Sequence, residues 1–157
     1  MAVLYLDVFD SKSYEILEKA LELEGSWHDE FDIVPIFNGS FQGYLPLLAL
    51  AWMQRAAPGT DCLFLLTLLG KSAPSVYGLD HILSSIRACG GGYEREIREQ
   101  LINDDNVNHL SDLLARSELL EIKALTMTEE GGRIFIGYSE VEVHLNKELR
   151  RANAWID

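Results

Sequence analysis

Cysteine is scarce in this chain of 157 residues, which has only Cys62 and Cys89 and no Cys-x-x-Cys spacing. Two isolated cysteines exclude a disulfide scaffold. Both lie in or beside apolar runs, so we interpret them as reduced, partly buried thiols that behave as small apolar residues. The expected location is therefore a reducing compartment, with the cytoplasm as the default.

Basic residues are also few. The chain has 13 lysines and arginines against 25 acids, for a formal net charge of -12. Nucleic-acid binding and binding to anionic membranes both need a basic surface, so the charge argues against both classes of function. Apolar runs such as 45–53 and 62–69 are too short to span a bilayer, and Asp7 comes too early for a signal peptide.

What is present is ample material for a core. Hydrophobic residues make up 48% of the chain, and its 4 prolines form no linker. A chain of this length and composition can fold without disulfides or metals. We therefore expect one soluble domain over residues 1–157, and neither a metal nor a cofactor.

The first half of the chain alternates strand and helix patterns. Pro35 lies in the second strand pattern and lacks a backbone donor, so it predicts an edge strand or a bulge there. Asp10 or Ser11 can cap the first helix. The continuous apolar run 62–69 is typical of a central strand covered on both faces. The expected order is strand 3–9, helix 13–24, strand 31–37, helix 44–57 and strand 62–69.

The second half predicts helices followed by antiparallel strands. Asn106 or Asn108 would cap the third of these helices, and 129–132 has the composition of a hairpin turn. The expected elements are helices 79–89, 93–102 and 107–117, strands 120–127, 133–138 and 141–145, and a terminal helix over 146–155. The predicted fold class is α/β or α+β: a mixed sheet, parallel in its first half, with an antiparallel hairpin near 120–145 and helices packed on it.

Catalytic motifs are incomplete. Asp7 at a strand end is followed by an acid three residues on, whereas phosphotransferases with a strand-end aspartate place the second acid two residues on. We interpret Asp10 as a helix cap instead. A small enzyme whose site assembles from dispersed residues is the alternative hypothesis, with Asp7, His81 and His109 to be examined first. A cysteine–histidine couple of His81 with Cys62 or Cys89 also stays open.

The charges are unevenly distributed. Residues 1–32 carry a net charge of -7, residues 33–92 of +1 and residues 93–157 of -6. If the hairpin lies beside the first strand and helix, the acidic flanks could form one negative face. Carboxylates beside an aromatic side chain can form a hot spot against a cationic partner, although Trp27 could instead pack into the core. The candidate partner-binding residues are Trp27, Asp29, Glu30, Asp32, Asp104, Asp105, Glu129 and Glu130.

The leading hypothesis from these features is a non-enzymatic protein that binds a basic protein partner. Its concrete form is an immunity or antitoxin-like inhibitor of a basic toxin domain such as a nuclease, because complementary charge speeds association and adds specificity. A dispersed-site enzyme is one alternative. The other is an accessory subunit, in which an apolar helix over 45–53 could supply a contact between copies of a homo-oligomer.

Overall fold

The computed structural model describes residues 2–8, 10–26, 30–36, 44–70, 78–92 and 94–154. Four strands form one sheet in the order β2-β1-β3-β4. Strand β1 (Ala2–Leu6) pairs parallel with β2 (Phe31–Pro35), and antiparallel with β3 (Thr126–Thr128), which in turn pairs antiparallel with β4 (Ile134–Ile136). The mixed sheet, its parallel first half and its antiparallel hairpin are confirmed, and the hairpin lies beside β1.

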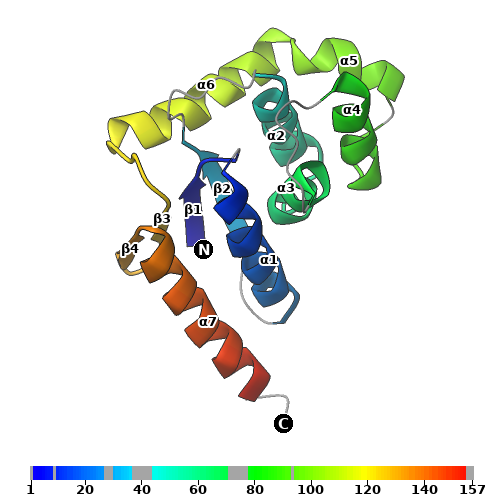
Figure 1. Ribbon diagram of the computed structural model, residues 1–157. Helices are drawn as coiled ribbons and strands as arrows, with labels where there is room; N and C mark the ends of the chain where they lie inside the picture. The colour runs from blue at the N-terminus through cyan, green and yellow to red at the C-terminus, as the bar shows by residue number, and fades with distance from the viewer. Residues whose placement is uncertain are drawn as a thin grey trace.

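Two helices cover one face of this sheet. Helix α1 (Ser11–Ser26) connects β1 to β2, and α7 (Tyr138–Ala154) follows β4 and packs alongside α1 (Figure 1). Apolar side chains of β1 and β3, among them Leu4, Leu6 and Met127, are fully buried in the main core. On the opposite face Tyr5, Val34 and Ile36 form a smaller cluster with Ile122.

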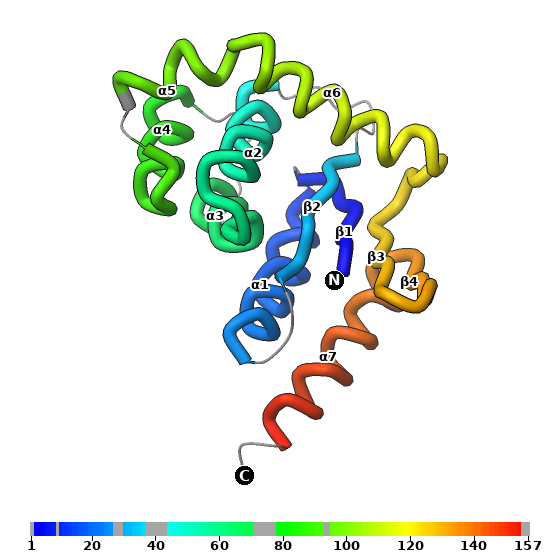
Figure 2. The backbone as a smooth tube through the Cα atoms, turned by 180° about the vertical axis from the view of Figure 1, so that it is seen from behind, coloured from blue at the N-terminus to red at the C-terminus, as the bar shows by residue number. Residues whose placement is uncertain are grey.

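Between β2 and β3, the described part of the chain forms five helices, and we refer to them as the helical insert. Helix α6 runs along one end of the sheet and packs on β2, while the other four gather beside it (Figures 1 and 2). They are α2 (Leu45–Ala56), α3 (Asp61–Leu69), α4 (Leu79–Ala88), α5 (Glu94–Leu101) and α6 (Asp104–Leu119). In the part of the chain that the structure describes, no helix is both long and apolar enough to cross a membrane.

Two predicted strands are helices. The run 62–69 forms most of α3, in which six of nine residues are buried. Its one solvent-facing side consists of Leu63, which is 44% exposed, Thr67, and the partly buried Leu66. Because this side is mostly apolar, the sequence of the helix looks like that of a buried strand. Residues 141–145 belong to α7, in which Val141, Leu145, Glu148 and Ala152 are buried at the spacing of a helix.

The start of α6 also differs from the prediction. The cap is Asn103, whose side-chain oxygen accepts a hydrogen bond of 2.8 Å from the Asp105 amide. Asn106 instead lies inside the helix and is fully buried. Its Nδ2 donates to the carbonyl of Leu48 at 3.0 Å and to that of Leu101 at 2.8 Å, joining α6 to α2 and α5.

Candidate functional site

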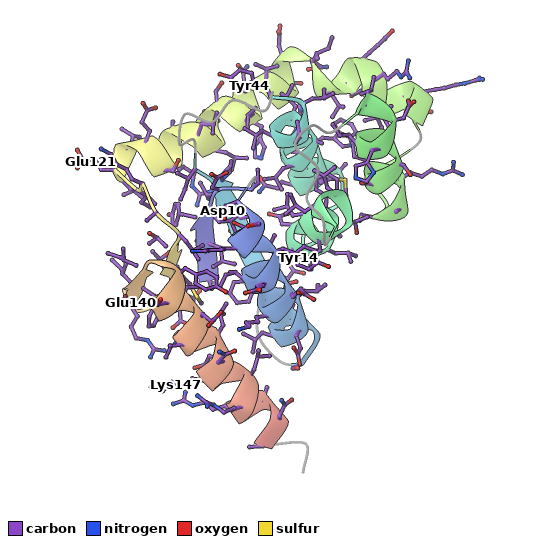
Figure 3. All side chains as sticks on the ribbon, in the orientation of Figure 1. Asp10, Tyr14, Tyr44, Glu121, Glu140 and Lys147 are labelled. Carbon is purple, nitrogen blue, oxygen red and sulfur yellow. The ribbon has the colours of Figure 1, made fainter. Side chains whose placement is uncertain are left out.

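A small polar pocket lies at the carboxyl end of β1, where the chain turns into α1. Ligands of open α/β sheets bind at the carboxyl ends of the strands, so this is the first place to look for a site. The cavity has a volume of about 100 Å³. Figure 3 shows Asp10 at the start of α1, on the rim of this turn. The pocket is lined by Asp7, Asp10, Lys12, Ser13, Ile36, Lys123, Ala124, Leu125 and Tyr138.

The turn itself is fixed by hydrogen bonds around the carbonyl of Asp7. The Asp10 amide donates to this carbonyl at 3.1 Å, and the Ser13 hydroxyl donates to it at 2.6 Å. Asp10 Oδ1 accepts a hydrogen bond of 3.0 Å from the Lys12 amide, which confirms Asp10 as the helix cap. The positive end of the α1 dipole therefore faces the pocket.

The far side of the pocket comes from distant parts of the sequence. Lys123 and its neighbours belong to the connection between α6 and β3, and Tyr138 begins α7. Lys12 Nζ lies 5.6 Å from the centre of the Tyr138 ring, within range of a cation–π interaction. The pocket thus combines a helix N-terminus with two lysines and two aspartates. It can accommodate an anionic group, or a small ligand that carries both signs of charge.

Tyr138 is held in place by carboxylates. Its hydroxyl contacts Glu142 at 2.5 Å and is also hydrogen-bonded to Glu15 of α1, while Lys19 Nζ lies 3.5 Å from Glu142 Oε2. The hydrogen bonds to Glu142 and Glu15 raise the pKa of the Tyr138 phenol well above its usual range. Tyr138 therefore stays protonated at neutral pH, and we assign it a positioning role rather than that of a base.

A second hollow shares Lys123 with this pocket. It has a volume of about 460 Å³ and lies between the C-terminal end of α6 and Tyr44, directly before α2. Its walls are mixed: Leu114 and Ile122 are apolar, whereas Glu118 and Glu121 are acidic. Figure 3 shows Tyr44 at the start of α2 and Glu121 at the end of α6, along the same end of the molecule.

Neither cysteine lies in the pocket. Cys62 is in α3 with its side chain fully buried, and Cys89 follows α4. Burial raises the pKa of the Cys62 thiol far above its usual range, and the charges of Glu24 and Asp61 raise it further. Such a thiol is inert as a nucleophile.

The residues proposed for a dispersed active site do not come together. Asp7 lines the pocket, but neither histidine does. His81 Nε2 is 2.8 Å from the carbonyl of Leu68, and His109 Nε2 is 2.9 Å from Gln54 Oε1. Within the described residues, no group of three or more histidines, cysteines or acids could hold a metal ion.

Two of the eight candidate partner-binding residues, Trp27 and Asp29, lie outside the described residues. Asp32 is half-buried in β2, and Glu129 directly follows β3 at the same end of the sheet, with β1 between the two strands. Glu129 Oε1 is 2.5 Å from His144 Nε2, and its Oε2 is 2.9 Å from Arg133. A charge so bound is less available to a partner.

The other acidic residues are spread over the molecule. Glu30 precedes β2 and Glu130 lies in the β3–β4 turn, both exposed. Asp104 and Asp105 form the first turn of α6, where negative charge favours the helix dipole. Figure 1 shows this end of α6 on the opposite side of the molecule from the hairpin. Binding of a basic protein by these residues stays an untested prediction.

Helix α2 does not offer the surface expected for contact between copies. Seven of its residues, from Pro46 to Met53, are buried against other elements of the same chain. Its apolar sequence is explained by its position in the core of the helical insert.

Comparison with known structures decides the fold. Oxidoreductase DsbA from Xylella fastidiosa superposes with a TM-score of 0.64 over 98% of this chain and 86% of its own, at 13% sequence identity. BdbD from Bacillus subtilis, in its oxidised form, superposes with a TM-score of 0.68 over 95% of this chain and 86% of its own, at 15% identity. This is a DsbA-like, thioredoxin-like fold.

The likeness is confined to structure. No protein-family model matches the sequence, and no curated protein matches it significantly. The DsbA-like fold nevertheless overturns the hypothesis of a non-enzymatic immunity or antitoxin-like inhibitor, which is wrong: the structural neighbours are an oxidoreductase, DsbA, and BdbD in its oxidised form. An acidic surplus without a catalytic motif does not identify an inhibitor, because the acids of this protein are spread out and partly bound internally.

The sequence showed only part of the site. Asp7 and Asp10 were noticed because they flank a strand end. Lys12 and Ser13 could have been found from the polar stretch 10–13 between a strand and a helix. Lys123 and Tyr138 carry no local signal, since only the tertiary fold brings them to the pocket.

Proposed function

We propose that this protein is a thiol-dependent oxidoreductase that activates the thiol of a bound substrate rather than a cysteine of its own. The observation that carries the proposal is the pocket at the start of α1: in a DsbA-like fold, it joins a helix N-terminus to Lys12 and Lys123 but contains no cysteine. Redox proteins with a Cys-x-x-Cys motif near a βαβ unit use such a helix N-terminus to lower the pKa of a thiol.

The chemistry requires a thiolate, because the thiolate and not the thiol is the nucleophile. A thiol bound in this pocket would lie near the positive end of α1 and two ammonium groups, all of which favour its ionised form. Its proton passes to solvent. The thiolate then attacks one sulfur of a disulfide R–S–S–R′, forms a mixed disulfide with RS and expels R′S⁻, which leaves with the electron pair of the broken S–S bond. A second thiol, from another substrate molecule, then resolves the mixed disulfide and completes the two-electron reduction.

The mixture of charges indicates the kind of thiol. Lys12 and Lys123 can pair with a thiolate or carboxylate, whereas Asp7 and Asp10 can pair with an ammonium group. An amino-acid or short peptide thiol carries all of these groups. The cytoplasm, where such thiols stay reduced, remains our proposed location.

Glutathione is the probe for the first experiment. We expect saturable binding by isothermal titration calorimetry, and faster exchange between glutathione and a chromogenic aromatic disulfide than without protein. Lys12→Gln and Lys123→Gln should each weaken binding about 10-fold, the value of one charge-assisted hydrogen bond. Lys147→Gln, an exposed change on α7 outside the pocket, is the matched control.

A second variant tests the source of the thiol. Cys62→Ala combined with Cys89→Ala removes every cysteine in the chain, and we expect it to retain both binding and exchange. Loss of exchange by this folded variant would show that the chain's own thiols react. Absence of glutathione binding by the wild type would refute the proposal outright.

A further inference from the structure

Strand β2 is an outer strand of the sheet, so one of its edges has no neighbouring strand among the residues that the structure describes. The Ile36 amide donates to the carbonyl of Leu6 in β1 at 2.9 Å. Backbone groups of a strand alternate in direction, so those of Phe31, Ile33 and Pro35 point away from β1. Unpaired groups along such an edge are costly when buried and invite pairing with other chains when exposed.

Side chains from four helices occupy this edge in place of a fifth strand. The Phe31 amide donates to a carboxylate of α1 at 2.7 Å, and the Pro35 carbonyl accepts from a hydroxyl of α6 at 3.1 Å. Pro35 has no amide hydrogen to satisfy, which explains why proline is tolerated here. The four side chains are Glu24, Gln54, Asp61 and Ser117.

Asp61 is the centre of this arrangement. Its side chain is 5% exposed, and its Oδ2 accepts hydrogen bonds from the Ile33 amide at 3.3 Å and from Gln54 Nε2 at 2.8 Å. Gln54 Nε2 also donates to the Ile33 carbonyl at 2.8 Å. The Gln54 oxygen can only accept, so His109 Nε2 carries the hydrogen of their 2.9 Å contact. One chain of hydrogen bonds thus connects β2, α2, α3 and α6.

The charges that face Asp61 are unfavourable for its carboxylate. Glu24 of α1 and Asp32 of β2 both oppose its ionisation, and its neighbour Cys62 is an uncharged thiol. His109 reaches it only through Gln54, and burial followed by the charge of Arg55 lowers the pKa of that histidine. None of the ion pairs formed between described residues includes Asp61.

We propose that Asp61 is a proton-operated latch, whose carboxyl group holds the helical insert to the free edge of β2 more tightly when it takes up a proton. The neutral acid keeps an oxygen that accepts from Ile33 and Gln54, and it avoids burying a charge among other acids. Unlatching exposes the edge of β2 and lets the ionised carboxylate reach water. The latch does not depend on the proposed enzymatic function.

The sign and range of the effect follow from linkage. Burial, the largest cause, raises the pKa of Asp61 from 3.8 to about 6. Between these values the folded state holds more protons than the unfolded state, so the latch weakens as the pH rises from about 4 to about 6 and changes little above that. A shift of about two pKa units corresponds to a change on the order of 100-fold in the latching equilibrium.

Native-state hydrogen exchange of the Ile33 amide tests the latch, with its rate expressed as a protection factor to remove the intrinsic pH dependence. We expect wild-type protection to fall on the order of 100-fold from pH 4 to pH 7. Asp61→Asn, which keeps an acceptor oxygen, should show no such fall, and the exposed Glu18→Gln should behave as wild type. Parallel profiles in the wild type and Asp61→Asn would overturn the proposal.

A pH titration of Asp61 in the wild type tests the proposal even if Asp61→Asn fails to fold, because it needs no variant. The carboxyl carbon of Asp61 can be followed by ¹³C NMR. A midpoint near 6 supports the latch, and a midpoint near 3.8, the value for an unperturbed aspartate, refutes it.

Discussion

Asn106 offers a sharp test of the packing between the helices of the insert. Its Nδ2 donates to two carbonyls, Leu48 of α2 and Leu101 of α5, in a site with no exposure to solvent. Its Oδ1 has no hydrogen-bond partner among the described residues. Asn106→Asp keeps the shape of the side chain but replaces the donor by a carboxylate that faces two carbonyl oxygens.

The cost of this change can be estimated from the contacts. A buried carboxylate cannot stay ionised against two carbonyls, so it must take up a proton, which costs about 4 kcal/mol at pH 7 for a group whose unfolded pKa is about 3.9. The neutral acid has one hydroxyl donor and can replace one of the two hydrogen bonds, so the other costs about 1 kcal/mol more. We expect Asn106→Asp to lower the free energy of unfolding by about 5 kcal/mol at pH 7 and by about 1 kcal/mol near pH 4.

Asn106→Ala is the matched variant. It loses two hydrogen bonds at about 1 kcal/mol each and leaves a small cavity, with no dependence on pH, so its cost should stay at about 2 to 3 kcal/mol. Urea unfolding followed by circular dichroism should therefore show that Asn106→Asp is less stable than Asn106→Ala at pH 7 and more stable than Asn106→Ala near pH 4. The same order at both pH values would refute this account of the site.

Two other predictions concern the core of the helical insert. Gly91→Ala places a Cβ 2.4 Å from Met53 Sδ, so thermal unfolding should show that the protein loses about 1 to 3 kcal/mol of stability. The control Gly25→Ala in α1, where a Cβ would have nothing within 4 Å, should leave the stability unchanged or raise it. Loss of stability in both variants would argue against overpacking as the cause. Cys62 should resist alkylation in the native protein and react once the protein is unfolded, because its thiol is buried and has a raised pKa. Labelling is measured by mass spectrometry, and rapid labelling of Cys62 in the native protein would contradict its burial.

The elements that could be predicted from the sequence are those with one polar solvated side. Helix α1 shows a clear apolar stripe because it lies on the sheet with its other face in water. Pro35 cannot donate to a ladder and so predicts an edge strand or a bulge, and β2 does lie at the edge of the sheet. Helix α3 could not be assigned, since its exposed side carries Leu63 and Leu66 beside Thr67, and apolar residues on that side hide the helical period. Residues 141–145 alternate between apolar and polar, as in a strand, and the helical period becomes visible only over the full length of α7.

The functional site was harder to predict for a different physical reason. Its lysines and tyrosine come from α1, the segment before β3 and the start of α7. These segments meet because β3 pairs with β1 across an insert of five helices. Nothing in the local sequence around Lys123 or Tyr138 distinguishes it from other surface sequence. The acidic clusters were more conspicuous, yet part of that charge lies in the first turn of α6 or binds His144.

The location of the thiols restricts the chemistry open to this protein. A DsbA-like fold offers a helix N-terminus that can stabilise a thiolate, yet this chain has aspartate, serine and lysine there and keeps its two cysteines in the helical insert. The buried thiol of Cys62 has a raised pKa and is not ionised, and neither Cys62 nor Cys89 lines the pocket, so neither is within reach of a disulfide bound there. If the pocket supports thiol chemistry, the sulfur must therefore arrive with the ligand, and the lysines that line the pocket are the groups positioned to ionise it.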